Sequence, residues 1–83
     1  MNPALWMPLS MVPTGRSVLL RRVQAGHGLT SRLAALGLLP GVRVHVCRND
    51  RSGPVVLGVA GSRLMLGHGM AQKMYVEDGE AEV

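Results

Sequence analysis

The chain has 83 residues, 47% of them hydrophobic, which is the size and composition of one small globular domain. It contains no Phe, one Trp and one Tyr, so its core must be built from aliphatic side chains and methionine. One cysteine excludes an internal disulfide. The net charge of +4 is uneven, because all nine Lys and Arg precede residue 77 whereas four of the five acids lie in residues 77–83. A basic body indicates an anionic partner: nucleic acid, lipid headgroups or an acidic protein.

The first residues predict a flexible leader (1–6) followed by a lead-in strand. Met7 to Pro13 is apolar but interrupted by Pro8 and Pro13, which favours extended chain over helix. A basic stretch followed by a continuous apolar run is missing, so we expect no signal peptide. No segment reaches the roughly 20 apolar residues that cross a bilayer. We therefore expect a cytoplasmic protein without direct membrane insertion.

A strand is predicted at 17–23, although its alternation is imperfect because leucines and arginines occur in adjacent pairs. Next, Leu29, Leu33 and Leu36 fall at i, i+4 and i+7, which predicts one buried face of a short helix capped by Gly28 or Thr30. Gly37 stands where a left-handed residue ends a helix. We expect Leu36 in the core and Leu38 or Leu39 in the end of the barrel.

Pro40 and Gly41 complete this corner and direct the chain into the clearest predicted strand, 41–48. Its valines alternate with Arg43, His45 and Cys47, which should share the opposite face. Further short strands are predicted at 55–59, 64–66 and 74–76, with a tight hairpin at 60–61 and one helical turn within 67–73. An acidic tail (78–83) follows, and we expect the whole stretch 77–83 to fray. The order predicts a mainly β fold, a small five-stranded, partly open barrel with one or two short helices.

Two stretches, "RLAALGLLPGVRVHV" and "GPVVLGVAGSRLMLGHGMAQKMYV", resemble the FeoA family of ferrous iron transport proteins. The resemblance covers residues 7–77 and rests on a helix ending in Leu-Gly, a Pro-Gly corner and short strands in the same order. It implies a free-standing SH3-like domain. It also implies a cytosolic accessory of the membrane transporter FeoB that contacts the transporter's G domain. Whether the effect is to activate, inhibit or assemble the transporter is left open.

No catalytic motif is visible, since Ser, His and acidic residues form no nucleophile motif and no phosphate-binding loop is present. We therefore expect no enzyme activity and no required cofactor. His45 and Cys47 could offer two donors to zinc or ferrous iron, with His27 or His68 as a third. This would make a small metal-binding or metal-sensing protein. The simpler interpretation, which we prefer, is a surface histidine beside a half-buried cysteine, with at most weak, adventitious metal binding.

The basic body also allows a nucleic-acid-binding barrel. Such barrels stack bases on aromatic rings, and proline-rich peptides likewise bind aromatic grooves. With Trp6 and Tyr75 as the only rings, both uses are disfavoured. A basic, aliphatic surface suits a protein partner or a second copy of the chain. Arg32 and Arg43, on either side of the Leu-Gly corner, are the candidate contact residues.

Overall fold

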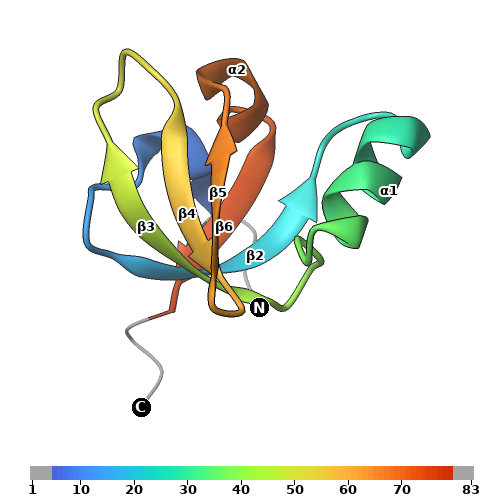
Figure 1. Ribbon diagram of the computed structural model, residues 1–83, viewed down its shortest axis with the longest axis horizontal. Helices are drawn as coiled ribbons and strands as arrows, with labels where there is room; N and C mark the ends of the chain where they lie inside the picture. Colours follow the sequence, from blue (N-terminus) through green and yellow to red (C-terminus); the bar gives the residue numbers. More distant parts are fainter. Residues whose placement is uncertain (1–4, 80–83) are drawn as a thin grey trace.

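The protein is built around one curled antiparallel sheet in the computed structural model, which describes residues 5–79 (Figure 1). The strand order is β1-β6-β2-β3-β4-β5, and the sheet does not close. Its strands are β1 (Met7–Pro8), β2 (Ser17–Val23), β3 (Arg43–Asn49), β4 (Val55–Val59), β5 (Ser62–Leu66) and β6 (Met74–Asp78). The helices are the 3-10 turn η2 (Leu9–Met11), α1 (His27–Ala35) and α2 (His68–Ala71). The expected mainly β, SH3-like fold is confirmed.

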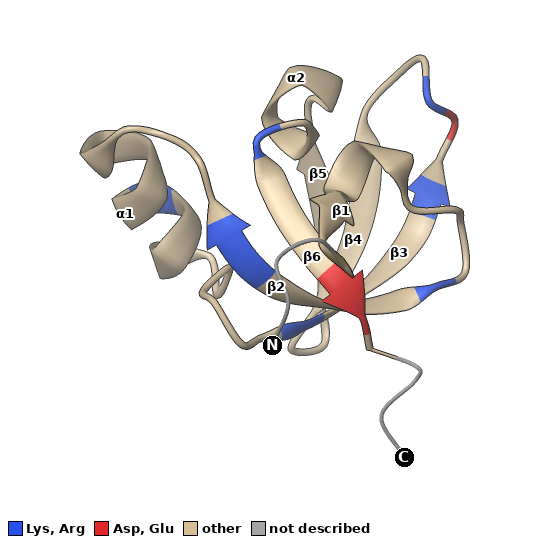
Figure 2. Cartoon of the chain, turned by 180° about the vertical axis from the view of Figure 1, so that it is seen from behind, with Lys and Arg blue, Asp and Glu red and all other residues tan. Residues whose placement is uncertain are grey.

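The lead-in segment is a strand only at its start, whereas extended chain was expected from Met7 to Pro13. It forms the two-residue strand β1, the sixth strand of the sheet, and then the η2 turn. β1 pairs with β6, so the start and the end of the described chain lie side by side (Figure 2). Residues 1–4 of the expected leader and 80–83 of the expected tail lie outside the described residues.

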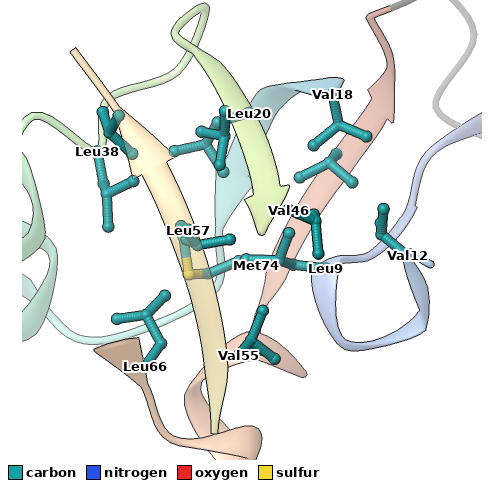
Figure 3. Close-up of a cluster of buried hydrophobic side chains, with 14 of the residues drawn as sticks. Leu9, Val12, Val18, Leu20, Leu38, Val46, Val55, Leu57, Leu66 and Met74 are labelled. Carbon is teal, nitrogen blue, oxygen red and sulfur yellow. The ribbon is translucent and has the colours of Figure 1, made fainter. Parts of the chain in front are cut away.

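The core lies inside the curl and is aliphatic, as the composition requires (Figure 3). Inward positions alternate along the strands, so Val44 and Val46 of β3 are buried while Arg43 and His45 are exposed. Met74 is the one fully buried methionine of the described chain and fills space between the strands. The other buried side chains of this cluster are Leu9, Val12, Val18, Leu20, Leu33, Leu38, Val55, Leu57, Val59, Leu66, Ala71 and Val76.

Two β-bulges explain where the alternation fails. The β2–β6 register shifts between Leu20 and Arg22, so Arg21 is an extra residue in β2. The β3–β4 register shifts between Val46 and Arg48, which makes Cys47 the extra residue in β3. A bulge adds one residue to one strand and reverses the faces that follow. The adjacent arginines of β2 therefore belong to a strand, although strict alternation does not hold.

Helix α1 begins at His27, two residues before the first leucine of the pattern, Leu29. Gly26 occupies the N-cap, and the Thr30 amide donates to its carbonyl to open the helix. The Thr30 hydroxyl donates to the Ala25 carbonyl at 3.3 Å, so it lies inside the first turn. The prediction that Gly28 or Thr30 caps the helix is therefore wrong. α1 lies at one side of the sheet, beyond the end of β2 (Figure 1).

The end of α1 is a Schellman motif. The Gly37 amide donates to the Ala34 carbonyl and the Leu38 amide to the Leu33 carbonyl, both at 2.9 Å. Gly37 has φ +93°, which confirms the predicted left-handed residue. Leu38 is 1% exposed and Leu33 is 3% exposed, so both sides of the motif enter the core.

Leu36 is not a core residue, contrary to the expectation. It is the C-cap of α1 and is 52% exposed. The helix ends before the leucine repeat does, so the chain has already left the helical path where Leu36 would turn inward. Leu38 takes the buried position, and Leu39 is 48% exposed.

Pro40 and Gly41 form the second half of the corner. The Val42 amide donates to the Leu39 carbonyl at 3.1 Å, and Gly41 has φ +95°. Proline followed by a left-handed glycine defines a type II turn. The Gly41 amide then donates to the Leu20 carbonyl at 2.6 Å, which fixes the corner to β2. The corner thus leads the chain from the end of α1 into β3, which pairs with β2 from its start.

The predicted hairpin at 60–61 is confirmed as a two-residue turn between β4 and β5. Both central residues are left-handed, with φ +50° at Ala60 and +82° at Gly61, as in a type I′ turn. A left-handed alanine costs roughly 1–2 kcal/mol, whereas Asn tolerates this conformation. We expect Ala60→Asn to raise the free energy of unfolding by about 0.5–1 kcal/mol in a denaturant titration.

The matched control is Ala35→Asn, at the exposed last residue of α1. There the backbone is right-handed, and Asn should lower stability by about 0.5 kcal/mol through its poorer helix propensity. Equal effects at the two positions would contradict the strain assigned to Ala60.

Candidate functional site: the α1 corner and the outer face of the sheet

The α1 corner carries one of the two predicted partner residues on an open surface. Arg32 is exposed in the last turn of α1, and Leu36 is the exposed C-cap that ends this helix. Leu39 is exposed in the turn that follows. Arg32, Leu36 and Leu39 are called the corner surface below. A cation beside exposed leucines is the composition found in protein interfaces.

Arg43 lies on the other side of the corner, as predicted, but its guanidinium is engaged within the chain. It is the first residue of β3, and its Nη1 donates to the Gly79 carbonyl at 2.7 Å. This bond joins the start of β3 to the end of β6. Arg43 therefore has a structural contact that a partner would have to preserve or replace.

His45 and Cys47 lie close together on β3, but the bulge holds Cys47 in a packed position. The Cys47 thiol is 3.9 Å from the His45 carbonyl, and it would be 3.4 Å from a Cβ at Gly58 on β4. His45 Nδ1 forms a hydrogen bond with Ser17 Oγ at 3.1 Å. Gly58 is thus a position of close approach between β3 and β4.

The other two histidines lie on different elements, His27 on α1 and His68 on α2. Within residues 5–79, no three His, Cys, Asp or Glu side chains lie close enough together to hold a metal ion. The expectation of at most weak metal binding therefore stays a prediction.

We expected Glu77 and Asp78 to belong to a frayed tail, and this is wrong. Both residues belong to β6. Asp78 pairs with Arg16 at 2.7 Å and Glu77 with Arg21 at 3.3 Å. The one other described acid, Asp50, pairs with Arg48 at 3.1 Å. All the acids of the described chain are therefore engaged by arginines.

A hollow on the outer face of the sheet brings together residues that the sequence did not connect. Trp6 and Tyr75 line it together with Arg22 and Gln24. We disfavoured an aromatic platform because Trp6 and Tyr75 are the only two rings. β1 pairs with β6 through Pro8 and Tyr75, which places Trp6 beside Tyr75. No local signal marks this meeting, because it depends on a pairing between the ends of the chain.

The described chain contains no helix that is both long and apolar enough to span a membrane. A curled antiparallel sheet, with a short helix between β2 and β3 and a glycine corner leading back into the sheet, defines a small SH3-like domain.

The chain belongs to the FeoA family, because the family described as FeoA domain matches residues 7–78. A curated protein of Methanocaldococcus jannaschii, provisionally named Fe(2+) transport protein A, is 37% identical over 73 residues. That match covers 88% of each of the two chains. The resemblance to the FeoA family is thus confirmed.

Solved structures agree with this assignment. The crystal structure of an iron uptake regulatory protein, FeoA, has a TM-score of 0.81 and 29% identity, covering 87% of this chain and 96% of that one. FeoA of Chlorobium tepidum has a TM-score of 0.80 and 27% identity, covering 88% of this chain and 70% of that one. ScaR, solved with bound Cd2+, has a TM-score of 0.76 and 27% identity, but only 35% of that chain is covered. The same fold therefore also occurs as part of a larger chain.

Proposed function

We propose that this chain is a cytoplasmic accessory of ferrous iron uptake and acts by contact with the FeoB transporter, through the transporter's G domain. The observation that carries the proposal is membership of the FeoA family along nearly the whole described chain. The relative's name refers to Fe(2+) transport, and no metal cluster is assembled within residues 5–79. A role through binding a protein fits this combination better than catalysis or metal storage.

The corner surface is the proposed contact. It presents two leucines that are about half exposed, and Arg32 makes no ion pair within the described chain. Burying such leucines stabilises a complex by removing apolar area from water. An unpaired arginine beside them can form a charge-assisted bond with an acidic partner. Arg43 supports this surface by holding β3 to the end of β6.

We expect Arg32→Glu to weaken binding to the FeoB G domain and to reduce the dependence of binding on salt, because a rim charge acts mainly on association. The free energy of unfolding should change by less than about 0.5 kcal/mol, since the side chain is exposed. Titration of the labelled G domain at two salt concentrations, together with denaturant unfolding, measures both effects.

Arg63→Glu is the matched control, since Arg63 is an exposed arginine on β5, at the opposite edge of the sheet from β1. It makes the same change in net charge on a different element of the fold. Equal losses of affinity in the two variants would show that net charge acts, and not this surface.

A further inference from the structure

The hollow on the outer face of the sheet gathers the chain's single Trp and single Tyr. Tyr75 of β6 lies between Pro8 of β1 and Arg22 of β2 in the strand register. The hollow has a volume of about 230 Å³, below the roughly 300–1,000 Å³ of small-molecule sites. This size suits one anchoring residue of a larger partner.

The bulge in β2 gives the two adjacent arginines different tasks on this face. Arg21 pairs with Glu77, and its guanidinium carbon lies 5.7 Å from the centre of the Trp6 ring. This cation–π contact holds one side of the ring. Arg22 lines the hollow, is exposed, and makes no ion pair within residues 5–79. One arginine therefore positions the ring while the other remains available to a ligand.

The charge around the hollow is positive. Lys73 is adjacent, because the Gln24 amide donates to the Lys73 carbonyl at 2.7 Å. In Figure 2 the end of β2 and the chain just before β6 are blue, whereas the end of β6 is red. The nearest acid along β6, Glu77, is already paired with Arg21. The hollow thus complements a negatively charged partner.

The Trp6 indole also lacks a partner, because its Nε1 is buried without a hydrogen-bond acceptor. An unsatisfied buried donor costs roughly 1–3 kcal/mol. Because Arg21 holds the ring, this buried donor is not available to a ligand, and Arg22 is the donor that an anionic ligand meets in the hollow.

We propose that this hollow binds an extended, acidic, proline-containing segment of a protein partner. The proline lies between the Trp6 and Tyr75 rings, and a neighbouring carboxylate binds Arg22. Proline segments bind aromatic grooves because their extended conformation is already formed before binding. A carboxylate and a guanidinium form a strong, charge-assisted pair.

Single-stranded nucleic acid fits the hollow less well. Such ligands need aromatic rings for successive bases and several phosphate contacts along a groove. Here both rings line one small hollow, beside one unpaired arginine and close to Lys73. The inference rests on the proposed role through protein contact, and it names a surface separate from the corner surface.

The test is a fluorescence titration, because Trp6 is the only tryptophan and lies in the proposed site. The probe is a capped peptide of alternating Pro and Glu, compared with a Pro/Lys peptide, an Ala/Glu peptide and an oligothymidylate. We expect a saturable change in Trp6 emission with the Pro/Glu peptide alone. Arg22→Glu should weaken this binding about tenfold or more, whereas Arg63→Glu should not.

Each other outcome contradicts the proposal in a defined way. A flat titration would contradict binding of the acidic segment. Equal binding of the Pro/Lys peptide would contradict the requirement for negative charge, and equal binding of the Ala/Glu peptide would contradict the requirement for proline. Preferential, Arg22-dependent binding of the oligothymidylate would replace the peptide by nucleic acid. Arg22 is exposed, so Arg22→Glu should fold even if Tyr75→Ala does not. No transporter is present in this test, so its failure is distinct from failure of the FeoB proposal.

Discussion

Gly37→Val should destabilise the protein by more than about 2 kcal/mol, because residue 37 is left-handed at the end of α1. A side chain of any L-residue is strained at φ +93°, and a β-branched side chain is strained most. Space is not the limiting factor for the first carbon, since a Cβ would be 3.6 Å from Val59 Cγ1. The substitution opposes both hydrogen bonds of the Schellman motif, which position Leu38 in the core.

Gly28→Val is the matched control, since it makes the same change in the same helix. Gly28 lies inside α1 and has no positive φ, and a Cβ at this position would have open space within 4 Å. Valine is a better helix former than glycine, so stability should stay the same or rise slightly. Thermal unfolding followed by circular dichroism compares the two variants. A Gly37→Val protein that melts with the wild type would contradict the left-handed corner.

Leu38→Ala should cost about 2–5 kcal/mol, because it removes a fully buried side chain from the end of the core. Leu38 packs in the same cluster as Leu33 and Val59 and follows directly after the helix end. The loss combines the lost burial of its methyl groups with the cavity that remains. In a domain of this size, such a loss is a large fraction of the total stability.

Leu36→Ala and Leu39→Ala provide the comparison within the same four residues. Both leucines are about half exposed, so each substitution should change the free energy of unfolding by less than about 0.5 kcal/mol. Denaturant unfolding of the three variants measures the contrast. A cost at Leu36 equal to that at Leu38 would mean that the helix continues to Leu36 and buries it.

The corner formed by residues 36–41 also shows how far the sequence can predict the fold. The Leu-Gly and Pro-Gly signals correctly predicted a left-handed helix end and a turn into a strand, because glycine and proline restrict the backbone locally. Which leucine becomes buried depends on the residue at which the helix ends and on the length of the turn that follows. A period of 3.6 extended through Leu36 predicts burial there, but the helix ends at Ala35 and Leu38 fills the core.

The outer face of the sheet was less predictable for a different physical reason. A bulge leaves no mark in composition, yet it moves Arg22 and the rest of β2 to the other face. The meeting of Trp6 with Tyr75 depends on pairing between β1 and β6, at opposite ends of the chain. The prediction that Glu77 and Asp78 fray failed similarly, since their arginine partners lie on β2 or just before it. Long-range pairing decided each case.

The family assignment and the physical features of the chain support the same role. The core is small and aliphatic, the described acids are all engaged by arginines, and the corner surface and the aromatic hollow are both accessible. Each of these surfaces suits contact with a protein. The proposed function accordingly assigns the influence on iron uptake to contact with a partner.

The most direct test is titration of the isolated cytoplasmic G domain of FeoB with this protein, in the nucleotide-free, GDP-bound and GTP-analogue-bound states. We predict saturable binding in at least one state, weakened by Arg32→Glu and retained by Arg63→Glu. Absence of binding by the folded wild-type protein in all three states would contradict direct contact with the transporter's G domain.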